Sequence, residues 1–227
     1  MHSALDLPQL LALAAAIGWA SGVRLYLVVL LVGLAGRLDW LPLPAGLQLL
    51  THPAVIAVSG FMVMVEFLAD KVPGVDSLWD AVHTVIRIPA GAALAAGLFS
   101  ADNSTMAVVA ALLGGGLAAT AHATKATTRA AINTSPEPFS NVGASLTEDA
   151  MVPTAQWLSV AHPLVFAVLL IVVLAICLWL IHKSWRFLRR LFTRMARIFS
   201  GKPDPGVAPA SSSPGDIPDV YKNPDRQ

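Results

Sequence analysis

Hydrophobic residues fall into five long runs that are separated by shorter polar stretches. The runs cover about 7–36, 53–69, 78–100, 105–132 and 160–182. A helix that crosses a membrane needs about 20 mostly apolar residues, and the last run meets this requirement most cleanly. The first run is long for one straight helix, which predicts a tilt or a kink. The pattern predicts an all-α polytopic transmembrane helix bundle of about five spans.

The composition agrees with insertion into a membrane. Of the 227 residues, 56% are hydrophobic and 13% are charged, whereas soluble domains average about 25% charged residues. This deficit argues against an ordinary soluble enzyme, a nucleic-acid-binding protein and a disordered chain. No Lys or Arg precedes Arg24, so the first run lacks the basic start of a signal peptide and is read as a retained span. Cys177 is the single cysteine, which excludes a disulfide framework.

The chain after the last run is first basic and then polar. Residues 183–202 contain seven Lys or Arg and no acid. Apolar residues recur there every three or four positions, which predicts an amphipathic helix that lies on the bilayer and binds anionic lipid headgroups. Residues 201–227 are rich in Pro, Ser, Gly and Asp, a composition typical of disorder. The expected organisation is a transmembrane domain over 1–182, a surface helix over 183–200 and a tail over 201–227.

The same basic segment predicts an orientation. Positive charge beside a span marks the cytoplasmic side, so we expect a cytoplasmic C-terminus. With five spans, the polar connections after the second and fourth runs then lie on the opposite side, together with the N-terminus. Lys71, Arg87, Lys125 and Arg129 would lie toward the outside, against the usual bias.

Charged residues on two of the runs recur at helical spacing. Asp76, Asp80, His83 and Arg87 have offsets of 0, 4, 7 and 11, and His122, Lys125, Arg129 and Asn133 have offsets of 0, 3, 7 and 11. Each set therefore lies on one face of a helix. A helix that carries charge at membrane depth must turn that face away from lipid, and such residues usually mark a pathway or site. The expected ion or substrate pathway comprises Arg24, Glu66, Asp70, Lys71, Asp76, Asp80, His83, Arg87, His122, Lys125, Arg129, Asn133, Asn141, Glu148 and Asp149.

Opposite charges within this set can pair. The acids Glu66, Asp70, Asp76 and Asp80 match in number the bases Lys71, Arg87, Lys125 and Arg129, with Arg24 pointing at them from the first run. A plain structural ion-pair network is the alternative interpretation. A metal site at Asp76, Asp80 and His83 is a weaker alternative, because Arg and Lys compete for the carboxylates. We expect no cofactor.

Small residues and two short similarities suggest further organisation. Ala14, Gly18 and Gly22 form a small-residue face that is typical of close helix packing, as do Gly91 with Ala95 and the glycines of 114–116. GWASGVR (18–24) resembles GLAATAH (116–122), and ADKVP (69–73) resembles DAMVP (149–153). These similarities allow an inverted repeat in which 140–150 is a short re-entrant element.

Two long polar segments resemble the hallmark segments of a bacterial family of multi-pass membrane proteins known as a domain of unknown function. The segments are EFLADKVPGVDSLWDAVHTVIR (66–87) and HATKATTRAAINTSPEPFSNVGASLTEDA (122–150). The resemblance covers about residues 10–180. It implies a small integral protein of the bacterial inner membrane and brings no activity, substrate or catalytic residue.

Three classes of function fit these observations. The leading hypothesis is a transporter or channel-like protein for a small ion or an anionic solute, with His83 and His122 as proton-coupled groups and a homodimer as the expected assembly. The second is a membrane-embedded enzyme acting on a lipid-linked phosphate, in which Asp76, Asp80 and His83 hold a metal or act as acid and base. The third is a structural or assembly factor of the membrane.

Overall fold

The computed structural model describes residues 5–72, 74–99, 103–133 and 138–199, and every regular element in these ranges is helical. The elements are α1 (Leu7–Arg37), the 3-10 helix η1 (Ala45–Thr51), α2 (Pro53–Ala69), α3 (Val75–Gly97), α4 (Ser104–Ile132), α5 (Pro138–Ala161) and α6 (Pro163–Phe199). The predicted all-α fold is confirmed. The chain divides into two compact units, 1–188 and 189–227, and the description below concerns the first.

Local sequence explains where the helices begin. The Asp6 side chain accepts from the Gln9 amide, and the Gln9 side chain accepts in return from the Asp6 amide, which forms a capping box ahead of α1. The side chains of His52 and Asn103 cap α2 and α4 by accepting from the amides of Ala54 and Met106, without the return bond. Helices α2, α5 and α6 start with proline, whose missing N–H costs nothing at a first helical position.

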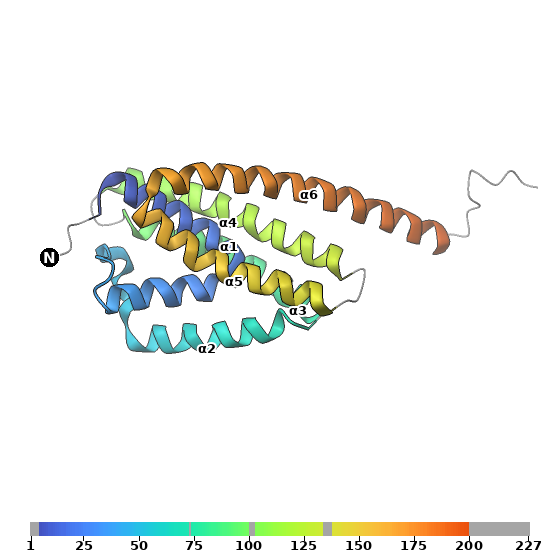
Figure 1. The fold of residues 1–227 in the computed structure, drawn as a ribbon, viewed down its shortest axis with the longest axis horizontal. Helices are drawn as coiled ribbons and strands as arrows, with labels where there is room; N and C mark the ends of the chain where they lie inside the picture. The colour runs from blue at the N-terminus through green and yellow to red at the C-terminus, as the bar shows by residue number, and fades with distance from the viewer. Residues whose placement is uncertain (1–4, 73, 100–102, 134–137, 200–227) are drawn as a thin grey trace, which may run out of the picture. The chain divides into compact units, whose positions relative to one another are not determined.

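Helix α1 is a hairpin of two helical halves. Arg24 has φ −146° and ψ 81°, which are not helical values. A straight helix of this length would separate its ends by about 46 Å. Both ends of α1 nevertheless lie beside the end of α5, because Gln9 donates to the Val160 carbonyl and Trp40 lines one pocket with Trp157. The predicted kink is therefore confirmed as a reversal of direction at Arg24 (Figure 1).

Helices α2 to α6 then alternate in direction (Figure 1). The turn between α2 and α3, the connection between α4 and α5, and α6 at Leu188 all lie at one end of this unit. The prediction that the two polar connections lie opposite the C-terminal end of the last span is wrong. It failed because α5 runs the length of the bundle between α4 and α6.

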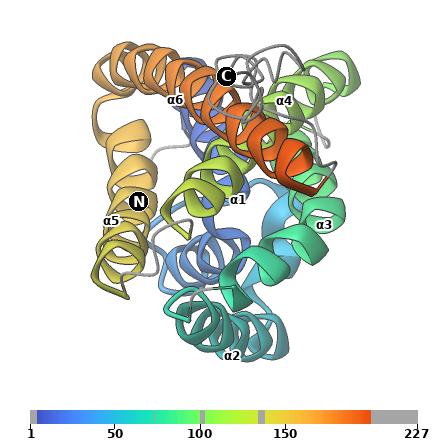
Figure 2. The ribbon, with the colours of Figure 1, turned by 90° about the vertical axis from the view of Figure 1, so that its right-hand side faces the viewer.

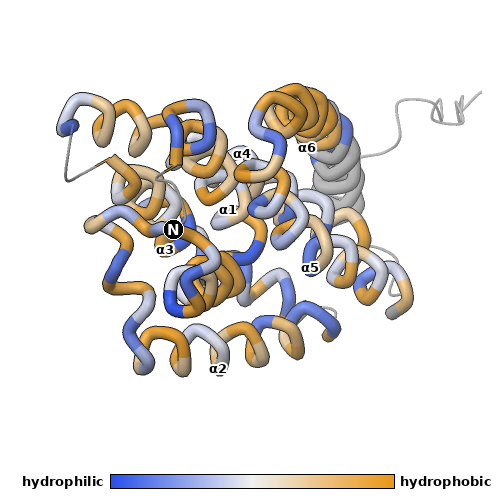
Figure 3. The backbone as a smooth tube through the Cα atoms, turned by 60° about the vertical axis from the view of Figure 1, so that its left-hand side comes forward, coloured by the Kyte–Doolittle hydropathy of each residue, from blue (hydrophilic) through white to orange (hydrophobic). Residues whose placement is uncertain are grey.

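The outer faces of the helices are apolar, as a bilayer requires. Large side chains such as Phe61 on α2, Val85 on α3 and Leu112 on α4 are exposed, and hydrophobic colour covers much of the tube (Figure 3). By length and composition alone, three helices could cross a membrane: Leu7–Arg37, Ser104–Ile132 and Pro163–Lys183, although the first of these reverses at Arg24. The pair η1–α2, bent by 69°, would make a fourth. The chain is thus a membrane protein with three or four candidate spans in its described part, fewer than the five expected.

Small residues bring the helices close together at the centre of the bundle. A side chain at Gly18 would collide with Gly114, and one at Gly22 with Ala118. A side chain at Gly91 would meet Ala118 as well. The small-residue faces therefore pack α1 against α4 and α3, as predicted, and α1 lies among α2, α3, α4 and α5 in the end-on view (Figure 2).

One helix pair departs from the expected inverted repeat. Gly18 contacts Gly114 and Gly22 contacts Ala118, so the residue numbers of both helices increase in the same direction. The first half of α1 therefore runs parallel to α4. Corresponding helices of inverted repeats run in opposite directions across the membrane. The re-entrant element expected at 140–150 is part of the 24-residue helix α5, and the broken helix is α1.

The basic segment continues α6 as helix up to Phe199. Residues 201–227 lie outside the described part of the chain. Headgroup binding at 183–202 and the division of this region into a surface helix and a tail stay predictions.

Candidate functional site

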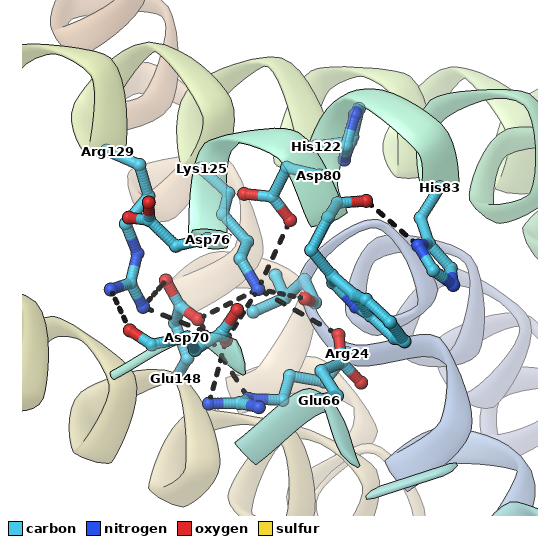
Figure 4. A network of polar contacts seen from close by, with 12 residues as sticks. Arg24, Glu66, Asp70, Asp76, Asp80, His83, His122, Lys125, Arg129 and Glu148 are labelled. Atoms are coloured by element: carbon cyan, nitrogen blue, oxygen red, sulfur yellow. Dashed lines mark hydrogen bonds and ion pairs between the residues drawn. The ribbon is translucent and has the colours of Figure 1, made fainter. Parts of the chain in front are cut away.

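Charged side chains from five helices meet inside the bundle in one cluster (Figure 4). They come from the break in α1, the end of α2, the inner faces of α3 and α4, and the middle of α5. We call this group the charged cluster, and it comprises the four bases and five acids that form ion pairs with one another: Arg24, Arg87, Lys125, Arg129, Glu66, Asp70, Asp80, Glu148 and Asp149.

Arg24 joins the break in α1 to two other segments. One guanidinium nitrogen lies 3.1 Å from Asp70 Oδ2 and donates to Ser145 Oγ at 2.8 Å. Its Nε lies 2.9 Å from Asp149 Oδ1. The Arg24 side chain is 1% exposed, so this residue holds a charge inside the bundle at the point where α1 reverses.

Lys125 on α4 lies at the centre of the cluster. Its Nζ donates to Asp70 Oδ2 at 3.0 Å and lies 3.2 Å from Glu148 Oε2 and 3.6 Å from Asp80 Oδ1. It also donates to the Val23 carbonyl at 3.3 Å. That carbonyl lies directly before the break in α1, where it has lost its helical partner. Lys125 therefore neutralises acids and satisfies freed backbone at once.

Two arginines hold the ends of the cluster. Arg87 on α3 pairs with Glu66 and donates to Asp80 Oδ1 at 2.7 Å. Arg129 on α4 lies 3.1 Å from Glu148 Oε1, and it donates to the backbone carbonyls of Asp70 and Asn141. A buried charge is stable only when it is paired and hydrogen-bonded, and the guanidinium groups meet this condition by binding several acceptors each.

Asp76, Asn133 and Asn141 form a polar extension of the cluster that contains no base. Asp76 Oδ1 accepts from the amides of Gly74 and Ser77, and both of its oxygens accept from Asn133 Nδ2. Asn141 in turn donates to Asn133 Oδ1 at 2.8 Å. Asp76 is thus satisfied by N–H groups at the start of α3, and the expectation that it pairs with a base is wrong.

The other predicted base, Lys71, stays outside the cluster. Its Nζ donates to the Phe67 carbonyl at 3.2 Å and lies over the Phe67 ring. It lies in the turn after α2, where burial lowers the pKa of its ammonium group and Asp149 opposes this effect. Arg24 takes the place that the sequence analysis gave to Lys71.

The two predicted histidines lie beside the cluster with different partners. His122 Nδ1 faces a guanidinium N–H of Arg87 at 3.3 Å, and its Nε2 lies 2.7 Å from Thr84 Oγ1. The Thr84 hydroxyl donates its hydrogen to the Asp80 carbonyl. These contacts therefore suit a neutral His122 that carries its proton on Nε2. His83 lies 3.1 Å from the Tyr26 hydroxyl and 2.8 Å from the Trp79 carbonyl.

The three residues expected to bind a metal ion do not surround one point. Asp76, Asp80 and His83 each turn to separate partners. Within the residues that the structure describes, no three His, Cys, Asp or Glu side chains are grouped to hold a metal ion.

The acids outnumber the bases in the charged cluster by five to four. Three oxygens of fully buried acids also lack a hydrogen-bond donor among the described residues: Glu66 Oε2, Asp70 Oδ1 and Asp80 Oδ2. Side-chain exposure is 0–1% for these three acids, 14% for Glu148 and 26% for Asp149. The cluster thus has spare acceptors inside and its two most accessible acids on α5.

Sequence reasoning missed Ser145, Thr84 and Tyr26, which bind Arg24, His122 and His83. Ser145 carries a signal, because it lies three residues before Glu148 and so shares its helical face. Thr84 and Tyr26 carry none, because a single hydroxyl in an apolar run is ordinary in a membrane helix.

Comparison with known proteins adds a family to this geometry. No curated protein and no solved structure matches the chain. The family model described as "Domain of unknown function (DUF4126)" matches residues 11–183, which include both hallmark segments and every member of the charged cluster. The chain belongs to the DUF4126 family.

Proposed function

We propose that this membrane protein transports a small ion and that the charged cluster is the site through which the ion passes. The observation that carries the proposal is the break in α1, because its reversal at Arg24 lies within the cluster. Non-helical backbone at membrane depth is tolerated where it is buried in protein or lines a water-filled cavity. Broken helices of this kind form the binding sites of many transporters.

The ends of the two half-helices support this proposal. The first half of α1 directs its last carbonyls, including that of Val23, at Lys125. The C-terminal end of a helix carries partial negative charge. A positively charged ion is therefore favoured at this position whenever Lys125 moves away. Asp70 and Asp80, which contact the Lys125 ammonium group, each also have one oxygen without a hydrogen-bond donor among the described residues.

The balance of charge favours a cation over the anionic solute that the sequence also allowed. Five acids face four bases within ion-pairing distance. Excess negative charge in a buried site attracts protons or metal cations and repels anions. The transported ion is therefore proposed to be a monovalent cation or a proton.

A purely structural role is the second candidate, and one observation favours it. Arg24, Lys125 and Arg129 each bind acids or carbonyls of at least two other segments, so the cluster ties five helices together. The enzyme hypothesis has less support, because Asp76, Asp80 and His83 do not converge on one point.

The orientation proposed here follows from the positive-inside rule. The turn between α2 and α3, which contains Lys71, lies at the same end of the 1–188 unit as the later part of α6, which carries Lys183 and Arg186, and this end is proposed to be cytoplasmic. A bacterial inner membrane as location and a homodimer as assembly stay proposals from the sequence.

The test is ion flux in proteoliposomes that contain the purified full chain. We expect flux of protons or of Na⁺ or K⁺ in the wild type, and a loss of at least tenfold in the charge swap Asp80→Arg with Arg87→Asp. The control is Asp39→Asn, which removes an exposed acid outside the cluster. A swap variant that regains wild-type melting temperature without flux supports a transport site. Absence of flux in the wild type, with a swap that restores stability, would favour the structural role.

A further inference from the structure

We infer that Glu148 carries a proton inside the charged cluster and exchanges it with the surroundings, so that the transported or coupling ion is a proton. This inference rests on the proposed function and names its ion. The numbers of acids and bases in the cluster, the contacts of each acid and the exposure of each acid support this inference.

The charge count requires a compensating positive charge. Each base of the cluster contacts at least two of its acids, and one acid remains in excess. Lys71, in the turn after α2, forms no ion pair within the cluster: its ammonium donates to the Phe67 carbonyl and feels Asp149 only at longer range. An uncompensated carboxylate in a buried site takes up a proton, since desolvation disfavours the charged form.

Four of the five acids have reasons to stay ionised or no route to exchange. Asp70 contacts Arg24 and Lys125 at 3.1 and 3.0 Å, and Arg129 lies near. In the turn beyond α2, burial raises the pKa of Asp70, but these three bases outweigh burial and lower it overall. Glu66 and Asp80 share Arg87 and are fully buried. Asp149 is the most exposed of the five and binds Arg24 closely.

Glu148 combines partial access with crowded surroundings. The charged groups that face it are Arg24 from α1, Asp70 from the turn after α2, and Lys125 and Arg129 from α4, while Asp149 follows it on α5. Arg24, Lys125 and Arg129 therefore pair with Asp70 as well as with Glu148, and Asp70 binds this set of bases as closely as Glu148 does. The Glu148 side chain is 14% exposed, although its Oε2 is buried, whereas the side chains of Glu66, Asp70 and Asp80 are 0–1% exposed.

The chemical step is a simple protonation. A hydronium ion breaks one O–H bond and leaves as water, while a lone pair on a Glu148 carboxylate oxygen forms the new O–H bond, and the group becomes a neutral acid. Release returns the proton to water and restores the carboxylate. No electron pair moves to another group. Glu148 then lies between the solvent and the buried acids of the charged cluster, and it acts as the site where protons exchange.

Infrared spectroscopy of the full chain in lipid tests this inference without requiring a variant. A protonated carboxylic acid gives a carbonyl band that a carboxylate lacks. The chain has three glutamates, Glu66, Glu137 and Glu148, so ¹³C-carboxyl glutamate should shift the band. Transfer to D₂O should shift it as well, because the proton exchanges. A band that is absent at neutral pH, unmoved by labelled glutamate, or unmoved by D₂O would overturn the inference.

Variants then assign the band to one residue. Glu148→Gln should remove it, and Asp39→Asn, an exposed acid outside the cluster, should keep it. Glu148→Asp retains an acid and should keep a band that labelled glutamate no longer shifts. Persistence of the band in Glu148→Gln would overturn the assignment and point to Glu66. The flux assay tests the transport proposal separately. Wild-type flux of Na⁺ or K⁺ with no such band would overturn this inference alone. An exchanging Glu148 band without any flux would overturn the transport proposal.

Discussion

Lys125 on α4 donates to the carbonyl of Val23, with 3.3 Å between Nζ and O. Val23 is the last residue before the break in α1, so the lysine occupies the position where the next turn of helix would have supplied an N–H group. The same ammonium group contacts Asp70, Glu148 and Asp80. The break in the backbone and the charged cluster are therefore stabilised by one side chain.

Lys125→Met should destabilise the protein strongly. The substitution keeps the length of the side chain but leaves a carbonyl and the shared acids without their donor, and removal of one partner from a buried ion pair costs roughly 3–5 kcal/mol. Thermal unfolding in lipid nanodiscs measures this. The control is Lys71→Met, where no ion pair is lost, and its melting temperature should stay near the wild-type value. Equal effects of the two substitutions would show that Lys125 does not have this role.

Gly22 and Gly116 provide a matched test of helix packing. A methyl group at Gly22 would collide with the backbone of Ala118, whereas one at Gly116 meets nothing within 4 Å. Gly22→Ala should lower stability by about 1–3 kcal/mol through overpacking. Gly116→Ala should leave it unchanged or raise it by up to about 1 kcal/mol, because alanine favours the helix. The prediction fails if both variants melt at the same temperature.

Ser145→Ala should weaken the attachment of α5 to the break in α1. The Ser145 hydroxyl accepts from Arg24 at 2.8 Å, and a buried donor left without its partner costs about 1–3 kcal/mol. Ser140→Ala is the control on the same helix, since Ser140 is exposed. Hydrogen exchange of α5 should become faster in the first variant alone. Unchanged exchange in Ser145→Ala would mean that the ion pairs hold α5 without this bond.

Side-specific labelling tests the arrangement of the helix ends. In a Cys177→Ala background, single cysteines at Lys71 and Lys183 should react with a membrane-impermeant reagent from one side, and a cysteine at Asp39 from the other. Lys71 lies in the turn between α2 and α3, and Asp39 follows the returning half of α1 (Figure 1). Labelling of Lys71 and Lys183 from opposite sides would contradict the fold described above.

Periodicity predicted the polar faces well because it is a local property. The offsets of Asp80 and Arg87 on α3, and of Lys125 and Arg129 on α4, follow from helix geometry alone, and each pair points into the charged cluster. The sequence also predicted that Arg24 points toward it.

The reversal at Arg24 and the path of α5 could not be predicted in this way. Arginine favours helices, so nothing at position 24 marks a break, and only the tertiary contacts of its guanidinium explain the geometry. Helix α5 is polar in its first half and contains Pro153, which led to the expectation of a short element. Its polar residues bind Arg24 and Arg129 instead of water, and this pairing depends on helices distant in the sequence.

The reversal of α1 also bears on how the chain enters a membrane. With the basic end of α6 in the cytoplasm, as the positive-inside rule expects, the parts that must leave the cytoplasm are the residues before α1 and the connections between α1 and α2, between α3 and α4, and between α5 and α6. None of these contains a lysine or arginine, and Arg37 is the one base next to them. The insertion machinery would thus move only short, weakly charged segments outward, while the cations remain on the side where the ribosome releases them.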